Sequence, residues 1–475
     1  MNTTIPLVIV IVYIVVLYLI SWYSTKFMTK SGSMGFFLAD RGLPAIIVGV
    51  MVAGLAIGGA STVGVAESAY TKGLSASMYN TAWAAGAALL GLLAAGRYRN
   101  MNISTIPELF ERFYTRSGRI IGVVGQLIIL LTIIALQYVA GGAVLTALLP
   151  EYFTFNSGMI VTAAVFVGIT MIGGYWAAGL SNLVNVIVIY LGLVVAGVMV
   201  VASAGGIDGI AASLPESPHW FSLMDGVGPV IVAGWFVVMI TQAFGAQGPA
   251  QIAFAAKSNA TARNGFLLGA LLIVPIGIVS ALIGMAAAAQ YPGLEKASMA
   301  LPTAILAQNP FVAGITLAGL WAADVSTAVA LLLGAATMLL NDVIKPVMKP
   351  KWSQKQEVNY SRFAVLLVAA VTFFMALNVQ SILGTIMIGL SLTTAYTIIL
   401  LATLFFPGLC RKSSAVWTLS VGILVILVWQ FVPAVRIFPH VIYAEWPAAL
   451  LTFLLVAVCS KEKCAIPKGF AKTPE

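Results

Sequence analysis

The chain has little of the side-chain chemistry that most enzymes and metalloproteins use. Its 475 residues include only two histidines, His219 and His440, and both fall in predicted external loops. The three cysteines lie on the predicted cytoplasmic side, where disulfides are rare: Cys410, Cys459 and Cys464. No Cys/His spacing suits a metal, no glycine loop suits a phosphate, and no nucleophile is paired with a base. The sequence therefore predicts that the chain is not an enzyme.

Charged residues are also scarce, at 8% of the chain, whereas 61% of the residues are hydrophobic. Together with a mean hydropathy of +1.03, this composition is typical of a polytopic membrane protein. Apolar runs of 17 to 30 residues are each long enough to cross about 30 Å of hydrocarbon. They predict an all-α fold of thirteen spans, near residues 5–24, 44–66, 77–96, 120–149, 158–175, 182–204, 228–246, 265–289, 311–340, 363–380, 382–406, 415–432 and 443–459.

The basic residues predict the orientation, because Lys and Arg collect in loops that stay in the cytoplasm. With the N-terminus outside and the C-terminus inside, 21 of the 24 basic residues fall in internal segments. These segments are 25–43, 97–119, 176–181, 247–264, 341–362, 407–414 and the tail from residue 460. The net charge of +9 is thereby explained by topology, and no nucleic-acid partner is expected. The first span lacks a basic start and a small-residue cleavage site, so we expect it to be retained.

Two spans carry clusters of glycine or proline that predict breaks in their helices. Span two reads "VAGLAIGGASTVG" over 52–64, and span seven ends in "AFGAQGPAQ" over 243–251. Breaks at matching places in two halves of a chain indicate a transporter's binding site. Span seven comes five spans after span two. Because five is an odd number of crossings, span seven enters the membrane from the side opposite to span two. Spans two to six and seven to eleven are predicted to form an inverted repeat.

Span nine contains a carboxylate in the sequence "WAADVST", residues 321–327. Asp324 stands there beside Ser326 and Thr327. An ionisable group at the centre of a membrane helix costs roughly 3 kcal/mol on insertion scales. Asp324 is therefore a candidate functional residue that needs a partner.

Several sequence blocks resemble the sodium:solute symporter family, which includes bacterial proline, pantothenate, sialic acid and galactose carriers and animal sodium-glucose and choline transporters. The blocks occur in the same order as in the family, between about residues 37 and 407. They are "FFLADRGLP" (36–44), "GRYRNMNISTIPELFERF" (96–113), "GGYWAAGLSNLVNV" (173–186), "FAAKSNATARNG" (254–265), "SALIGMAAAAQYPG" (280–293) and "LAGLWAADVSTAVALLLGAATMLLND" (317–342).

This resemblance implies a LeuT-type fold in a single transporter domain, residues 1–475. The expected parts are a first helix and internal loop (1–43), a first repeat (44–226), a second repeat (227–407), and two extra helices with a cytoplasmic tail (408–475). The implied location is the inner or plasma membrane, and the implied partners are the lipid bilayer and a small organic solute. The oligomeric state is left open by the sequence, with a monomer as one plausible state.

The resemblance also implies a sodium site between the break in span two and span nine. Inside lipid, a small cation is held by unwound carbonyls and by Ser or Thr hydroxyls, which supply oxygens without adding charge. The implied ligands are the carbonyls of Gly54, Ile57 and Ala323 and the hydroxyls of Ser326 and Thr327. The last three are spaced i, i+3 and i+4, which places them on one face of a helix.

The chain departs from the family in residues that bear on ion coupling. Many members carry an aspartate at the start of span six, where this chain has Asn182. Val329 and Ala330 stand where sialic acid carriers place hydroxyls for a second sodium ion, so we expect no second site of that kind. Asp324 has three possible roles here: it supports sodium through its charge, it takes up a proton itself, or it is hydrogen-bonded at a helix contact and has no role in transport. Glu67, near the external end of span two, is a candidate for gating or for solute contact.

The solute pocket of such folds lies at mid-membrane between the two broken helices and their neighbours. Alignment with the galactose carriers places eight residues there: Ala56, Ser61, Tyr79, Asn80, Trp83, Gln247, Ser391 and Thr394. Ala56 and Ser61 replace amide side chains of those carriers. A sugar is therefore disfavoured, because a hexose needs many buried hydrogen-bond partners. Trp83 could instead cover a compact solute or make a cation–π contact with an amine.

The residues and the resemblance together predict a secondary active transporter that couples one inward sodium ion to uptake of a small organic solute. Proton coupling through Asp324 is the leading alternative. A sensor or receptor module is a remote alternative, because only 16 residues follow Cys459.

Overall fold

The structure is a computed structural model that describes residues 4–24, 26, 38–170, 175–344, 354–379, 382–467 and 469–470. Within these residues the chain is helical, and the only β-type pairings are two isolated bridges, Leu43 with Ala256 and Arg411 with Lys463. Much of the predicted internal loops 25–43 and 341–362 lies outside the described residues.

The helices follow the apolar runs of the sequence. The longer ones are α1 (Thr4–Ser24), α5 (Met78–Leu93), α8 (Arg116–Leu148), α9 (Phe155–Thr170), α10 (Tyr175–Ser203), α12 (Pro229–Gly245), α14 (Asn259–Gln290), α16 (Pro310–Met338), α18 (Gln354–Ala376), α20 (Thr393–Phe405), α21 (Ser414–Phe431) and α22 (Ile442–Cys459). The shorter ones are α3 (Ala45–Ala56), α4 (Val65–Lys72), α6 (Ala95–Asn100), α7 (Ile106–Phe113), α11 (Gly206–Ser213), α13 (Gln247–Ala255), α15 (Ala300–Leu306) and α19 (Ile382–Ser391).

Eight helices of the described chain are long and apolar enough to cross a membrane. Two further helix pairs pass the same test together but are bent, by 55° after Ala56 and by 45° after Gly245. The remaining predicted spans fall on shorter apolar helices, including α9 and the second part of α18. The structure therefore confirms a polytopic helical protein, while the count of thirteen and the orientation stay predictions.

The first bend lies where the sequence clusters glycines. After α3 the chain passes through Ile57 to Gly59 and continues as a π-helical turn, η3 (Ala60–Gly64). A β-carbon at Gly59 would lie 2.1 Å from Cβ of Ala140 on α8. Real β-carbons do not approach so closely, so glycine is what lets the break pack against α8.

A side chain from another helix stabilises the second bend. Ala246, between α12 and α13, has extended backbone angles (φ −89°, ψ 144°). Gln126 of α8 donates to the Gly245 carbonyl at 2.6 Å and accepts from the Gln247 amide at 3.1 Å. It thereby satisfies two backbone groups that the interruption leaves without helical partners.

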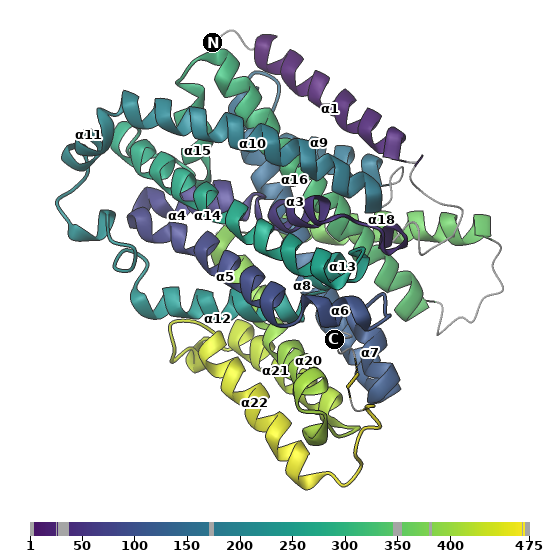
Figure 1. Cartoon of the computed structure of the whole chain (residues 1–475). Coiled ribbons are helices and arrows are strands. Elements are labelled where there is room, and N and C mark those ends of the chain that lie inside the picture. Colours follow the sequence, from purple (N-terminus) through teal and green to yellow (C-terminus); the bar gives the residue numbers. More distant parts are fainter. Residues whose placement is uncertain are drawn as a thin grey trace.

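The two predicted repeats pack into one another. Helices α3 and α5 pack on α14, α5 also packs on α12, and α8 and α10 pack on α16. Helix α1 lies along one edge of the molecule against α10 and α16, and α21 and α22 form the opposite edge (Figure 1). Both breaks therefore lie in the interior, with the terminal helices outside the core.

Candidate functional site

The break in span two lies against the hydroxyl pair of α16. The Thr327 hydroxyl donates to the carbonyl of Gly54 at 2.8 Å. A β-carbon at Gly54 would lie 2.5 Å from Oδ1 of Asn182 on α10. Three elements that are far apart in sequence therefore meet at Gly54: α3, α10 and α16.

The break also releases the two carbonyls that the sequence singled out. In a continuous α-helix the amides of Gly58 and Ser61 would bond to the carbonyls of Gly54 and Ile57. Here the Gly58 amide bonds to the Ala56 carbonyl at 3.1 Å, and the Ser61 amide bonds to the Gly58 carbonyl at 3.2 Å. Gly54 and Ile57 therefore lose their helical partners, and their oxygens are available to a ligand.

Ser326 belongs to a polar network that joins α16 to α10. Its hydroxyl lies 3.0 Å from the Ala323 carbonyl and 3.1 Å from Oδ1 of Asn182, and either oxygen can accept its proton. Asn185 donates to the same hydroxyl at 2.8 Å, and it accepts from the hydroxyl of Tyr13 at 2.9 Å. The sequence analysis missed Asn185, although its spacing of three residues from Asn182 on an apolar helix marks the same helix face.

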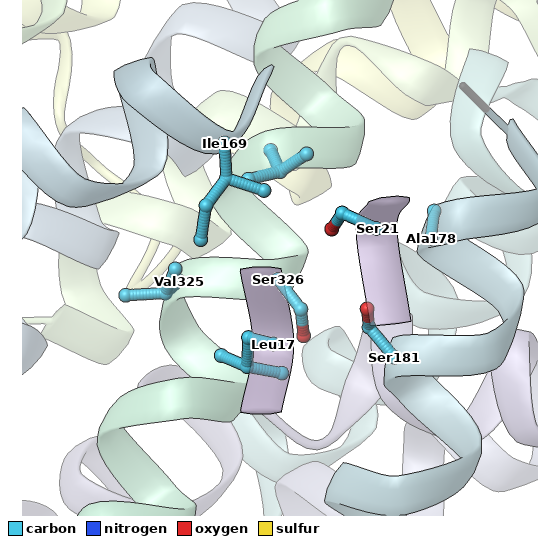
Figure 2. Close-up of a pocket in the computed structure, with 8 residues that line it drawn as sticks. Leu17, Ser21, Ile169, Ala178, Ser181, Val325 and Ser326 are labelled. Atoms are coloured by element: carbon cyan, nitrogen blue, oxygen red, sulfur yellow. The ribbon is translucent and has the colours of Figure 1, made fainter. Parts of the chain in front are cut away.

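A small cavity lies on the far side of this network, next to the first helix. The free space amounts to about 20 Å³ and is lined by Leu17, Ser21, Ile169, Ala178, Ser181, Val325, Ser326 and Val329. Figure 2 shows the hydroxyls of Ser21, Ser181 and Ser326 around the same space, from α1, α10 and α16 respectively. Val329, which stands where a second sodium ligand would be needed, lines this cavity with an apolar side chain.

Asp324 faces the break and not the hydroxyl pair. Its side chain is buried, at 1% exposure. A β-carbon at Gly58 or Gly59 would lie 3.5 Å or 3.1 Å from its Oδ1 atom. The Gly59 amide is the nearest donor but does not reach hydrogen-bond geometry, so neither carboxylate oxygen is bonded within the described chain.

A second small cavity, with about 30 Å³ of free space, lies beside the break on the side facing α5, α8, α12 and α19. Three of the predicted solute residues line it: Ala56, Tyr79 and Trp83. Gln137 of α8 and Gln242 of α12 also line it and were missed by the sequence analysis. A glutamine inside an apolar span is itself a signal of a functional position, because its amide needs partners that lipid cannot supply.

The other predicted solute residues lie elsewhere. Ser61 bonds to the backbone of Gly58 within its own turn, and Ser391 bonds to the carbonyl of Met387. Asn80 donates to the Ile273 carbonyl on α14. Gln247 donates to the Ser104 carbonyl and accepts from the Ile106 amide, which joins α13 to the start of α7, and Thr394 is buried on α20 outside the cavity lining.

Glu67, in the outer part of span two, hydrogen-bonds to the start of α19 (Ile382–Ser391). Its carboxylate accepts from the amide of Ile382, the first residue of α19, at 3.4 Å. A β-carbon at Gly64 would lie 2.9 Å from the Ile382 side chain, so the two segments are packed closely. This placement suits the gating role that the sequence left open, since Glu67 does not line the cavity of Ala56 and Trp83.

Comparison with known families gives this geometry a context. The model of the sodium:solute symporter family matches residues 36–422, which is most of the chain. The chain belongs to the sodium:solute symporter family. It is therefore a transporter and not an enzyme, a multi-pass protein of the plasma membrane, and sodium is its coupling ion.

Individual relatives of the symporter are distant but match over nearly their whole length. It is 24% identical to the osmoregulated proline transporter OpuE of Bacillus subtilis, over 88% of this chain and 87% of that protein. It is 25% identical to the sodium/proline symporter of Escherichia coli, over 86% of this chain and 84% of that protein.

Solved structures confirm the fold. A sodium-coupled sialic acid symporter superimposes with a TM-score of 0.79 at 15% identity, covering 98% of this chain and 99% of that one. The nucleobase-cation-symport-1 family transporter Mhp1 superimposes with a TM-score of 0.61 at 15% identity, covering 91% and 94%. The symporter therefore shares the LeuT-type architecture expected from its sequence.

Proposed function

We propose that the symporter carries one sodium ion inward together with a small organic solute by alternating access. The ion is held by the carbonyls of Gly54, Ile57 and Ala323 and by the hydroxyls of Ser326 and Thr327. The observation that carries this proposal is the break itself, which releases two carbonyls beside the hydroxyl of Thr327. These donors are uncharged oxygens, which suits a monovalent cation in a low-dielectric interior.

The solute is proposed to bind in the cavity of Ala56, Tyr79 and Trp83. Tyr79 makes an edge-to-face contact with Trp235, at 6.3 Å between ring centroids, which packs this wall of the cavity against α12. Two curated relatives are named for proline, which makes compact amino acids the first solutes to test. The contact between Glu67 and Ile382 would have to open for a solute to enter from outside.

A thermal-shift screen of the purified symporter tests both parts of the proposal. The compounds are amino acids, monocarboxylates, quaternary ammonium compounds, nucleobases and vitamins, each with and without sodium chloride. We expect sodium to raise the melting temperature, and one class of compound to raise it further only when sodium is present. A choline chloride control separates sodium binding from ionic strength. If a compound raised the melting temperature equally with and without sodium, the proposed coupling would be contradicted.

The proposed topology has thirteen spans, an external N-terminus and an internal C-terminus. Residues 44–226 and 227–407 form the inverted repeats, residues 1–43 precede them, and residues 408–475 follow them. The packing of α1 on one edge and of α21 and α22 on the other supports this division (Figure 1).

Thiol labelling tests the topology. The three native cysteines are first replaced by serine, because Cys459 is exposed and would itself react with the reagent. Lys461→Cys and Asp208→Cys are then introduced singly at exposed positions. We expect an impermeant maleimide to label Cys at 461 only in inside-out vesicles and Cys at 208 only in right-side-out vesicles. Labelling of both positions from one side would contradict the odd number of spans.

Proton coupling is the second candidate, and the burial of Asp324 without a bonded partner favours it. Reconstituted vesicles with the solute found in the screen distinguish the two. Under the sodium proposal, an imposed sodium gradient drives accumulation, and an imposed pH gradient in sodium-free buffer drives none. Accumulation driven by the pH gradient alone would show that a proton replaces sodium, and loss of that accumulation in Asp324→Asn would assign the proton to Asp324.

A further inference from the structure

Asp324 and the solute cavity meet at the same point of the break. A β-carbon at Gly58 would lie 3.5 Å from Oδ1 of Asp324 and 3.5 Å from Nε2 of Gln137. Gly58 and Gln137 both line the cavity that also holds Trp83. The carboxylate therefore lies immediately behind the cavity wall, where the wall is a glycine without a side chain.

Four acceptor atoms around this cavity have no hydrogen bond within the described chain. They are both carboxylate oxygens of Asp324 and the Oε1 atoms of Gln137 and Gln242. All three side chains are at least nine-tenths buried, at 1%, 4% and 4% exposure. Each unpaired buried acceptor costs about 1–3 kcal/mol and a charged one more. A ligand that brought hydrogen-bond donors would remove these costs.

The carboxylate also lacks a positive neighbour. No described Lys, Arg or His side chain lies close enough to interact with Asp324 electrostatically. The sodium site does not use it either: the Thr327 proton goes to Gly54, and the Ser326 proton goes to Asn182 or Ala323. A buried carboxylate without a counter-charge is strongly unfavourable, so either a proton or a second positive charge besides sodium must neutralise Asp324.

We infer that the solute supplies this charge, and that it is a compact amine whose ammonium N–H groups are accepted by Asp324, Gln137 and Gln242. The inference rests on the proposed function and names the substrate class of that site. N–H groups are required, because the unpaired atoms are acceptors and a quaternary ammonium has no proton to donate. Trp83 and Tyr79 cover the hydrocarbon part, and the free space of about 30 Å³ must widen before even a compact solute enters, which disfavours a large one.

Matched compounds test the inference in the thermal-shift assay, with sodium chloride present throughout. Each amine is measured beside an isostere in which oxygen replaces nitrogen: proline beside tetrahydrofuran-2-carboxylate, alanine beside lactate, and ethanolamine beside ethylene glycol. N,N-dimethylproline keeps the positive charge but has no N–H. We expect at least one amine to stabilise the symporter, and its isostere and its N-methylated form to bind at least 100-fold more weakly.

Three variants test which side chains bind the amine. Asp324→Asn removes the charge and keeps the shape, and we expect it to abolish stabilisation by the amine while sodium alone still stabilises. Gln137→Leu is expected to weaken the amine at least tenfold with the same sodium response. Asp208→Asn, an exposed substitution on the short helix α11, is the control and is expected to change neither. Retained sodium stabilisation also shows that a variant is folded.

The outcomes separate the inference from the proposed function. Absence of any sodium effect in the wild type contradicts the proposed function. A normal sodium effect with no amine bound, or with isosteres bound as well as amines, overturns only the inference. If Asp324→Asn binds the amine normally, the carboxylate does not bind the amine, and the inference is wrong.

Discussion

Replacing Ser326 and Thr327 together by alanine should raise the half-saturating sodium concentration at least tenfold. The double variant removes two of five proposed oxygen ligands, and a tenfold change corresponds to about 1.4 kcal/mol. The structure makes the pair a specific target, because the Thr327 hydroxyl contacts the released Gly54 carbonyl and the Ser326 hydroxyl contacts Ala323. The measurement is the sodium dependence of thermal stabilisation, and of uptake once a solute is identified.

A matched control removes two hydroxyls that serve only their own helices. Thr132 bonds to the Ile128 carbonyl at 2.8 Å, and Thr452 bonds to the Ala448 carbonyl at 2.7 Å. The double variant Thr132→Ala with Thr452→Ala should keep the wild-type sodium dependence. If the Ser326 and Thr327 variant also kept it, the sodium ligands would have been assigned wrongly.

Gly59→Ala should lower the rate of sodium-driven uptake more than tenfold. The added methyl group would lie 2.1 Å from the Cβ of Ala140, so the break would have to move away from α8. Overpacking of this kind typically costs 1–3 kcal/mol. The displacement would shift the carbonyls of the sodium site and widen the solute cavity, and both effects reduce coupling.

The control for this variant is Gly334→Ala on α16, where a β-carbon would meet no atom within 4 Å. We expect it to transport normally and to be at least as stable, because alanine favours a helix more than glycine does. Initial rates in vesicles are compared at equal amounts of reconstituted protein, with melting temperatures measured in parallel. Normal uptake by Gly59→Ala would show that the break does not need its close contact with α8.

The fold followed from the sequence to a large extent. Apolar runs mark the helices because lipid admits only segments whose backbone groups are bonded internally. The two helix breaks were predicted from the glycine cluster of residues 52–64 and from Gly245, Gly248 and Pro249, and both bends lie in these segments in the structure. Glycine and proline reveal such places because they alone tolerate or require a departure from helical backbone.

The candidate site was less completely predictable. Thr327 lies against Gly54 and Ser326 contacts Ala323, as their helical spacing suggested, while their binding of sodium stays a prediction. Asn80, in contrast, hydrogen-bonds to the backbone of α14, and Gln247 hydrogen-bonds to the start of α7. Helical periodicity gives the face on which a residue lies but not which neighbour that face meets. Gln137 and Gln242 entered the cavity because α8 and α12 pack around it, which no local pattern reveals.

The sequence by itself determined the class of the molecule: a helical membrane transporter with two broken helices and a hydroxyl pair on span nine. These properties depend on local chemistry, namely hydropathy, glycine content and the spacing of side chains along one helix. Only the tertiary structure decided which polar groups surround the break in span two. The carboxylate of Asp324 turns toward Gly58 and Gln137 and away from the hydroxyl pair because of how α16 packs on α8 and α10. Which polar atoms remain unpaired depends on contacts between distant segments, and those exist only once the helices have packed.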